Sequence, residues 1–303
     1  MNNQVAVLIP CFNEAITIGN VIDKVKGAMP QARVYVFDNN STDDTARIAA
    51  EHGAIVDREY RQGKGHVMRS MFRKIDADCY VMIDGDDTYS VEEMPRMCDM
   101  VLNEGVDMVV GCRTNYLNVN QRPMHNSGNL LVRFLINKLF NSNVPDIMTG
   151  YRAMSRDFVK TFPLLSNGFE IETEMTIYAL DNNYLIKSID TNYQDRPQGS
   201  TSKLNTFADG YKVLKTILKL FINNKPLMFF SICALLCLLV AVIALIPVFA
   251  EYFRTGLVPR FPTLFVGCML IILSFLSLSV GLILKFMNLR HKQLVQLIRN
   301  TMH

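Results

Sequence analysis

Two long apolar runs near the C-terminal end are the clearest feature of the hydrophobic pattern. Leu227–Phe249 carries no charged residue, and Phe261–Phe286 carries only Lys285. Each run exceeds the roughly 20 residues that a helix needs to cross the apolar core of a bilayer. Two buried core helices are the alternative, but globular helices rarely run this long without a polar face. The pattern therefore predicts two membrane-spanning helices joined by the short connector Ala250–Arg260.

Short apolar runs of strand length alternate with segments of helical periodicity over the first 110 residues. The predicted strands are Val5–Ile9, Arg33–Phe37, Ala54–Val56, Cys79–Ile83 and Met108–Val110, and the predicted helices are Ile16–Met29, Thr42–His52, Gly65–Ile75 and Val91–Asn103. This alternation favours an α/β fold with a mostly parallel, doubly wound sheet. Such sheets bind ligands at the carboxyl ends of their strands, so the residues that follow each strand are candidates for a site.

The pattern is less regular beyond residue 110, until apolar residues again recur at helical spacing in Leu204–Ile222. This segment also carries three lysines on its other faces. It could pack on the preceding domain, but a basic amphipathic helix directly before a membrane span more often lies in the lipid interface, which we favour. We therefore expect an α/β domain over residues 1–203, a juxtamembrane helix over 204–225, and two membrane helices with a basic tail over 226–303.

Charge changes the picture through its distribution, since the net charge is only +3. Four lysines precede the first apolar run, and four basic residues lie at or beyond the end of the second, whereas the connector offers only Arg254 and Arg260. The positive-inside rule then places both termini and the α/β domain in the cytoplasm of a multi-pass cell-membrane protein. The first ten residues lack the pattern of a signal peptide. The seven cysteines form no CxxC pair, as expected for reduced cytosolic thiols.

Three carboxylates directly follow one predicted strand, in the sequence Asp84-Gly85-Asp86-Asp87. Carboxylates this close together repel one another, and a hard divalent cation such as Mg²⁺ or Mn²⁺ would relieve that repulsion. A metal held by one or two carboxylates can also bind a substrate diphosphate. Taken alone, the cluster could equally be an Asp-Gly turn with solvated acids.

Hydrogen-bonding side chains also follow the first two predicted strands. Residues 10–14 read Pro-Cys-Phe-Asn-Glu, and residues 38–44 read Asp-Asn-Asn-Ser-Thr-Asp-Asp. Such groups can contact a base and a ribose, although the second segment also suits a helix N-cap. Gly63-Lys64-Gly65 adds a flexible loop with a cation before a helix, which can approach a phosphate.

In this order, the motifs resemble those of family 2 glycosyltransferases of the GT-A fold. Residues 146–152, Asp-Ile-Met-Thr-Gly-Tyr-Arg, are similar to the D-x-x-(S/T)-G-(F/Y)-R segment of polyprenyl-phosphate glycosyltransferases. Residues 196–204 are similar to the R-x-x-G-x-S-K-L segment of the same enzymes, with one extra residue before Ser202. These enzymes include dolichol-phosphate mannosyltransferases and bacterial undecaprenyl-phosphate glucosyltransferases. The two apolar runs resemble the anchor of the bacterial branch.

The resemblance implies a role for each matched residue. The nucleotide would lie on Pro10, Asn13, Glu14, Asp38, Asn40, Lys64, Asp84 and Gly85, and the metal on Asp84 and Asp86. Asp86 and Asp146 would be the catalytic residues, with Asp146 facing the acceptor. Candidates for binding the acceptor phosphate or the diphosphate are Arg133, Arg152, Arg196, Ser202 and Lys203. Arg133 is the weakest of these, because a lone arginine in an apolar helix can simply extend to solvent.

The implied reaction is direct, inverting transfer of a sugar from a nucleotide sugar to a polyprenyl phosphate, for modification of a cell-envelope glycan. A phosphate monoester is largely dianionic at neutral pH and needs little help from a general base. Asp146 would therefore orient the phosphate or accept its residual proton. The resemblance to the anchored bacterial branch favours UDP-glucose or UDP-N-acetylglucosamine as donor, with GDP-mannose as the alternative.

Two other functions compete with this one. A saccharide-directed transferase of the same fold typically carries a Q-x-x-R-W motif, and this chain has no tryptophan. A catalytically inactive membrane scaffold is the second, and the intact acidic motif argues against it. The expected partners are thus a nucleotide sugar, a polyprenyl phosphate and the membrane, with a possible homo-oligomer and no nucleic acid.

Overall fold

The computed structural model describes residues 4–117, 133–168, 170–197, 215, 218, 221–223 and 225–302. The chain divides into two compact units, Met1–Ile217 with Met302–His303, and Leu218–Thr301. Ser202, Lys203 and most of the expected juxtamembrane helix lie outside the described residues. Its described positions, 215, 218 and 221–223, are helical.

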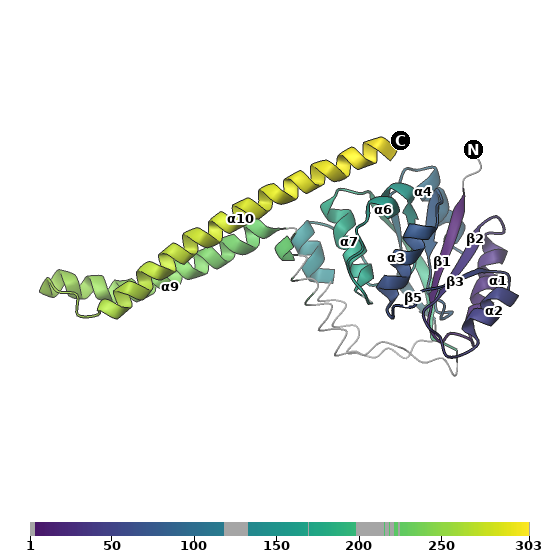
Figure 1. The fold of residues 1–303 in the computed structure, drawn as a ribbon, viewed down its shortest axis with the longest axis horizontal. Coiled ribbons are helices and arrows are strands. Elements are labelled where there is room, and N and C mark those ends of the chain that lie inside the picture. The colour runs from purple at the N-terminus through teal and green to yellow at the C-terminus, as the bar shows by residue number, and fades with distance from the viewer. Residues whose placement is uncertain are drawn as a thin grey trace. The chain divides into compact units, whose positions relative to one another are not determined.

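A seven-stranded sheet in the order β3-β2-β1-β4-β6-β5-β7 forms the centre of the first unit (Figure 1). The strands are β1 (Val5–Cys11), β2 (Arg33–Asp38), β3 (Ile55–Arg58), β4 (Cys79–Met82), β5 (Met108–Leu117), β6 (Arg152–Ser155) and β7 (Ile186–Gln194). β6 runs antiparallel to β4 and β5, and the other pairings are parallel. The mostly parallel α/β sheet predicted from the sequence is therefore confirmed.

Helices cover both faces of this sheet, because successive side chains of a strand point to opposite faces. Val7 and Ile9 of β1 pack into a core with α1 (Ile18–Ala28), α2 (Thr45–Glu51) and α4 (Met94–Leu102). Ala6 and Leu8 pack into a second core with α3 (Lys64–Lys74), α6 (Arg156–Thr161) and α7 (Ile171–Asp181). Burial on both faces explains why these strands are continuous apolar runs in the sequence.

The direction of β6 brings a distant segment of the chain to the carboxyl edge of the sheet. β6 pairs with β4 so that Arg152 lies opposite Met82 and Ser155 opposite Cys79. An antiparallel strand begins at the edge where its parallel neighbours end. The segment Asp146–Tyr151, which leads into β6, therefore reaches the same edge as Asp84–Asp87. The sequence pattern predicted neither β6 nor β7 nor α7.

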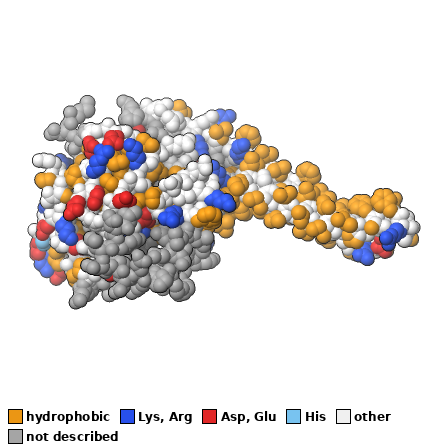
Figure 2. Space-filling view, turned by 180° about the vertical axis from the view of Figure 1, so that it is seen from behind, with side chains coloured by type: hydrophobic (Ala, Val, Ile, Leu, Met, Phe, Trp, Pro, Cys, Tyr) orange, Lys and Arg blue, Asp and Glu red, His pale blue; other side chains and the backbone are white. Residues whose placement is uncertain are grey.

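The second unit is built from two helices, α9 (Pro226–Thr255) and α10 (Phe261–Met302). Ser274 Oγ donates a hydrogen bond to the Ala234 carbonyl oxygen at 2.8 Å, and Ser277 Oγ donates to the Phe230 carbonyl oxygen at 3.0 Å, so the two helices pack together. Hydrophobic side chains are exposed along both (Figure 2). By length and composition, both helices could cross a membrane, with mean hydropathies of 3.2 and 2.5 in their most apolar windows.

α10 is longer than the apolar run that predicted it. The run ends at Phe286, but the helix continues to Met302, because residues 287–302 contain no glycine or proline to end it. Its 42 residues span about 63 Å at 1.5 Å per residue, roughly twice the thickness of a bilayer core. The expected basic tail is therefore the last part of one continuous helix.

Candidate active site

A pocket of about 390 Å³ lies at the carboxyl edge of the sheet. Its walls come from the end of β1 and the residues after it, from the residues after β2, β3 and β4, and from β5 and β7 with Arg196 beyond it. Met148, in the segment before β6, and the first turns of α3 and α7 complete the lining. The residues expected from the sequence that line it are Pro10, Glu14, Lys64, Asp84, Gly85, Asp86 and Arg196. Seven expected residues from four distant segments therefore meet in one pocket.

The acidic motif after β4 turns two carboxylates into the pocket and one away. Asp84 and Asp86 line the pocket, whereas Asp87 is ion-paired with Lys24 at 2.7 Å on the side of α1. Asp86 is fixed by Thr88, whose Oγ1 donates to Asp86 Oδ1 at 2.7 Å. Burial, together with the charge of Asp84, raises the pKa of Asp86 above its usual value. The ionised pair is therefore destabilised and would gain from a cation.

Asp84 and Asp86 each already have a basic side chain beside them. Lys64 Nζ lies 2.5 Å from Asp84 Oδ1 and 2.6 Å from Glu172 Oε1, and Arg196 Nη2 lies 2.6 Å from Asp86 Oδ2. Burial alone would lower the pKa of Lys64, but the carboxylates of Asp84 and Glu172 outweigh it and raise that pKa. Lys64 is therefore a charged ammonium held between two acids. The sequence analysis did not single out Glu172, which lies in the first turn of α7.

Two glycines fix the loop that carries Lys64. Gly65 N donates to the Asn167 carbonyl oxygen at 3.0 Å, and a Cβ on Gly65 would lie 2.2 Å from the Ser166 carbonyl oxygen. Gly63 has φ +129°, and a Cβ there would lie 2.2 Å from the Asn167 carbonyl oxygen. The Gly-Lys-Gly sequence is thus required by close contact with the 166–167 backbone, which fixes the start of α3.

The charge of the pocket fits a divalent cation. Its described lining contains four carboxylates, Glu14, Asp84, Asp86 and Glu172, and three cations, Lys64, Arg113 and Arg196. Arg113 is paired with a fifth carboxylate, Asp146. The described residues of the site therefore include two more carboxylates than cations, an excess of acidic groups that suits a divalent cation such as Mg²⁺ or Mn²⁺. Carboxylate oxygens are the ligands these metals prefer, usually completed by water and substrate phosphate oxygens. Within the described ranges, no three or more His, Cys, Asp or Glu residues are grouped so that they could hold a metal ion by themselves, so substrate or water oxygens would have to complete the site.

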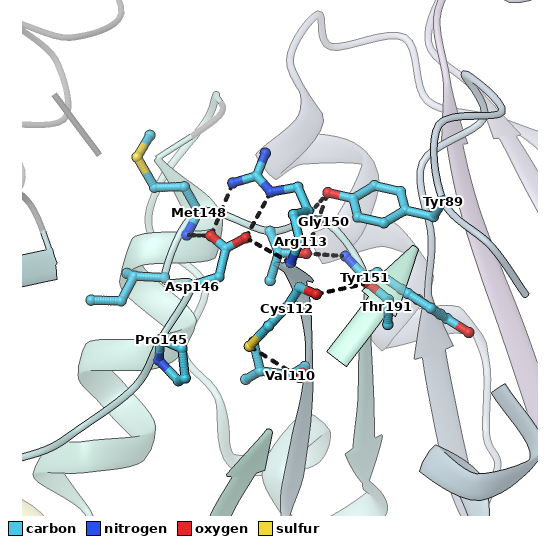
Figure 3. Close-up of polar contacts among 12 residues, drawn as sticks. Tyr89, Val110, Cys112, Arg113, Pro145, Asp146, Met148, Gly150, Tyr151 and Thr191 are labelled. Atoms are coloured by element: carbon cyan, nitrogen blue, oxygen red, sulfur yellow. Dashed lines mark hydrogen bonds and ion pairs between the residues drawn. The ribbon is translucent and has the colours of Figure 1, made fainter. Parts of the chain in front are cut away.

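Arg113 and Asp146 form a buried ion pair on the pocket wall (Figure 3). Arg113 Nε lies 2.7 Å from Asp146 Oδ2, and Arg113 Nη2 lies 2.9 Å from Asp146 Oδ1, so the third guanidinium nitrogen points away from the carboxylate. Met148 N also donates to Asp146 Oδ1 at 3.2 Å. Burial would raise the pKa of Asp146, but the hydrogen bonds and charge of Arg113 outweigh it and lower that pKa. Arg113 lines the pocket, and Asp146 holds it there.

The segment that carries Asp146 packs directly on the acidic motif. Tyr89 Oη accepts a hydrogen bond from Gly150 N at 3.1 Å and lies 3.3 Å from Thr149 Oγ1 (Figure 3). A Cβ on Gly150 would lie 2.3 Å from Asp84 Oδ2. The two motifs, more than 60 residues apart in sequence, therefore form one packed unit.

Arg152 lies elsewhere than expected. The sequence made it a candidate for binding the acceptor phosphate or the diphosphate, but its side chain is fully buried and does not line the pocket. It donates hydrogen bonds to the carbonyl oxygens of Thr149 (3.1 Å) and Ile147 (2.6 Å) and to Thr176 Oγ1 (2.9 Å). Arg152 thus supports the 146–150 segment through hydrogen bonds, and in this structure its side chain does not reach the pocket.

Three residues expected to hold the nucleoside build the neighbouring loops and do not line the pocket. Asp38 accepts a hydrogen bond from Ser41 N at 3.1 Å and lies 3.3 Å from Arg58 Nε. Asn13 Oδ1 accepts from Thr42 N at 2.8 Å, and Asn40 Nδ2 donates to the Tyr60 carbonyl oxygen at 2.7 Å. Asn39 lines the pocket in their place.

Of the other acceptor candidates, Arg133 is exposed and donates to the Pro145 carbonyl oxygen at 3.2 Å. It therefore lies beside the Asp146 segment and outside the pocket lining.

A mostly parallel α/β sheet with an Asp-x-Asp pair at the end of a central strand, and cations around it, defines a GT-A-like nucleotide-sugar fold. Residues 6–162 match the sequence profile of Glycosyl transferase family 2, and the chain belongs to this family. The protein is a glycosyltransferase.

Relatives and solved structures agree with this assignment. Glycosyltransferase AglJ of Haloferax volcanii is 33% identical over 235 residues, covering 76% of this chain and 76% of that protein. The dolichyl-phosphate hexose transferase of Haloferax volcanii is 27% identical over 223 residues, covering 74% of this chain and 96% of that protein. The glucosyl-3-phosphoglycerate synthase of Mycobacterium tuberculosis, in complex with Mn²⁺, UDP and glucosyl-3-phosphoglycerate, has the same fold, with a TM-score of 0.60, 23% identity, and coverage of 72% of this chain and 80% of that one.

Proposed function

We propose that the protein transfers a hexose or N-acetylhexosamine from a UDP-sugar to a polyprenyl phosphate at the membrane, with a divalent metal. The observation that carries this proposal is the Arg113–Asp146 pair on the wall of the pocket that contains Asp84 and Asp86. One pocket thus offers an acidic pair suited to a metal-bound diphosphate and a fixed guanidinium suited to a second phosphate. The relative named dolichyl-phosphate hexose transferase supports a lipid-phosphate acceptor.

The donor side is formed by the acidic pair and its cations. A divalent metal on Asp84 and Asp86 would act as Lewis acid for the leaving nucleoside diphosphate. The structure of glucosyl-3-phosphoglycerate synthase with Mn²⁺ and UDP supports the same use of this fold here. Lys64 and Arg196 lie close enough to the acidic pair to neutralise a diphosphate bound there. Pro10, Phe12 and Asn39 line the side where the nucleoside would lie.

The acceptor side depends on charge and orientation more than on proton transfer. The lipid phosphate oxygen would attack the anomeric carbon while the bond to the nucleoside diphosphate breaks, with inversion of configuration. The phosphate is largely dianionic at neutral pH and needs no strong base. The lowered pKa of Asp146 makes it a poor base and a good anchor for Arg113. Positioning and charge neutralisation therefore account for the role of this pair.

The helices α9 and α10 support a membrane location, where a polyprenyl phosphate is found. We further propose that both termini and the α/β domain face the cytoplasm. Basic residues are concentrated before the first apolar run and at the end of the second, whereas the connector between the runs has only two.

The test is transfer of label by the purified full-length protein in detergent to undecaprenyl phosphate. Radiolabelled UDP-glucose, UDP-N-acetylglucosamine and GDP-mannose are compared, each with Mg²⁺, Mn²⁺ or a chelator. We expect label in the lipid fraction from a UDP-sugar, lost on chelation. Label from GDP-mannose alone would establish the mannosyl alternative. Label that enters a saccharide acceptor, with none in the lipid, would overturn the proposal.

A further inference from the structure

Lys64 is held by two carboxylates from different elements. It is the first residue of α3, Asp84 follows β4, and Glu172 lies in the first turn of α7. The Lys64 side chain is only 10% exposed and that of Glu172 only 5%. An ammonium this deeply buried needs a carboxylate partner at all times, because an unpaired buried charge is strongly unfavourable.

The position of Lys64 conflicts with metal binding at Asp84. Lys64 Nζ lies 2.5 Å from Asp84 Oδ1, at the distance of a direct hydrogen bond. A divalent cation on the same carboxylate would be repelled by the ammonium at that distance. Arg196 stands in the same relation to Asp86, at 2.6 Å. A metal on these oxygens would therefore compete with a resident cation at each carboxylate.

Glu172 resolves this conflict for Lys64. Glu172 Oε1 lies 2.6 Å from Lys64 Nζ, so Lys64 can release Asp84 and still remain paired. The backbone at both ends of this contact is fixed, since Gly63 and Gly65 pack on the 166–167 backbone. Glu174 accepts from Leu165 N at 3.1 Å and Ser166 N at 2.9 Å, which ties the same loop to α7. On the Asp84 side of the site, the exchange therefore needs a movement of the Lys64 side chain and none of its backbone.

We propose that Glu172 is a positioning residue that keeps Lys64 in the pocket while Lys64 exchanges Asp84 for the diphosphate of the donor. Asp84, once released by Lys64, would be free to hold the metal, and the Lys64 ammonium, still paired with Glu172, would donate a hydrogen bond to the incoming phosphate. Metal and nucleotide binding are thereby coupled through one side chain. This inference rests on the metal-dependent donor site of the proposed function, but not on the identity of the acceptor or of the base.

The test measures binding and not transfer. Mn²⁺ binding to the full-length protein in detergent is followed by electron paramagnetic resonance, alone and with saturating pyrophosphate, which carries no base or sugar. In Glu172→Gln, Lys64 has no second partner when it leaves Asp84, so Mn²⁺ alone should bind at least roughly tenfold more weakly. With pyrophosphate present, Lys64 gains a partner, and the loss should fall below about threefold.

A double-mutant cycle separates this role from a general loss of negative charge. Lys64→Met removes the competing cation, so Mn²⁺ alone should bind at least as tightly as to the wild type, while pyrophosphate with Mn²⁺ binds at least roughly tenfold more weakly. In the Lys64→Met background, Glu172→Gln should change Mn²⁺ binding less than about threefold. Glu51→Gln removes the same charge from the exposed Arg47–Glu51 pair of α2, outside the pocket lining, and is the control; it should leave the coupling between Mn²⁺ and pyrophosphate unchanged.

An equal loss of Mn²⁺ affinity in Glu172→Gln with and without Lys64 would overturn the inference, as would a wild type that binds no Mn²⁺. If the cycle behaves as expected but no sugar reaches a lipid phosphate, the inference stands and the proposed acceptor is wrong.

Discussion

Gly150 and Asp84 are in such close contact that a single methyl group would not fit between them. A Cβ built on Gly150 lies 2.3 Å from Asp84 Oδ2, 2.7 Å from Asp84 Cγ and 2.8 Å from Asp84 Oδ1. The whole carboxylate of a proposed metal ligand therefore packs on the backbone of the segment that carries Asp146. Glycine at position 150 is explained by this contact.

Replacing Gly150 by alanine should displace the Asp84 carboxylate. Overpacking of a tight contact costs about 1–3 kcal/mol, which corresponds to a loss of Mn²⁺ affinity of roughly five- to 150-fold if the cost falls on Asp84. Mn²⁺ binding and sugar transfer should be measured together. Gly27→Ala is the control, because Gly27 lies in α1 with no atom within 4 Å of the place that a Cβ would take, and alanine should stabilise the helix by about 1 kcal/mol. Unchanged Mn²⁺ affinity in Gly150→Ala would show that Asp84 is not a metal ligand.

Asp86→Asn should make the protein inactive and more stable at neutral pH. The pKa of Asp86 is raised by burial and by Asp84, so its ionised form destabilises the folded state once the pH rises above the ordinary carboxyl range. Asparagine removes that charge and can still accept the hydrogen bonds from Thr88. We expect kcat/KM to fall on the order of a hundredfold or more.

Thermal unfolding provides the second measurement for Asp86→Asn. Its Tm without metal should exceed that of the wild type, and added Mn²⁺ should raise the Tm of the wild type only. Near-normal transfer by this variant with a chelator present would rule out the assigned metal site.

The pH dependence of transfer should distinguish an anchor from a base at Asp146. Its pKa is lowered by Arg113, so its stabilising contribution is fully present above the ordinary value of 3.8 and is lost only as the pH falls through the lowered value. Asp146 therefore does not titrate between about pH 5 and pH 9. The proposed acceptor, a lipid phosphate, would itself give a rise in rate near pH 6.

Asp146→Asn should lower kcat/KM for the lipid acceptor by roughly tenfold or more at every pH in this range, because Arg113 loses its charged partner. The rise near pH 6 should remain in the variant. Its disappearance would identify Asp146 as the proton acceptor.

Substitutions of Arg152 and Arg196 should have different effects, the first on stability and the second on activity. Arg152→Met leaves the carbonyl oxygens of Ile147 and Thr149 without their buried donor, so unfolding should become easier by about 2–5 kcal/mol, with a clear fall in Tm. Arg196→Ala removes a side chain that is 25% exposed in the pocket, and should lower kcat/KM roughly a hundredfold while changing Tm little. The KM values of Arg196→Ala for the donor and for the acceptor show whether Arg196 binds the diphosphate or the lipid phosphate. Equal Tm values for the two variants would contradict this division.

The membrane topology can be tested with tags. Tags at either terminus should be protected in sealed, right-side-out cells, and a tag within residues 256–260 should be accessible. The reason is that more basic residues lie before the first apolar run and at the end of the second than in the connector between them. Accessible termini would overturn the topology, and with it a cytosolic donor.

The sequence predicted the first half of the fold well, for a physical reason. Strands β1, β2 and β4 are buried on both faces, so they are apolar runs that need no knowledge of their neighbours. α7 was missed because it is buried nearly all round and mixes acids with apolar residues, which leaves no periodic apolar face. β7 was missed because it is a partly exposed edge strand, and most of its side chains are polar.

The site was predicted where its residues follow a predicted strand. Asp84 and Asp86 were found this way, and the same rule could have found Arg113, which comes three residues after the predicted strand Met108–Val110. Glu172 could not be predicted as a site residue, because its place in the site depends on its contact with Lys64, which lies in another helix. Arg152 was misread because the motif that contains it shows which residues are close, but not which side chains are buried.

The reversed direction of β6 has a consequence for how the two substrates are spaced. The pairing of Met82 with Arg152 fixes, through backbone hydrogen bonds, how far the segment beginning at Asp146 stands from Asp84. The pairing of β4 with β6 would thus set the distance between the proposed donor and acceptor sites. Insertions elsewhere in the chain would leave this distance unchanged. A shift of the β4–β6 pairing by two residues would displace the segment beginning at Asp146 relative to Asp84 by about 7 Å. In the proposed reaction, variation in the loops would therefore alter which acceptor enters, while the sheet would set the distance between the reacting atoms.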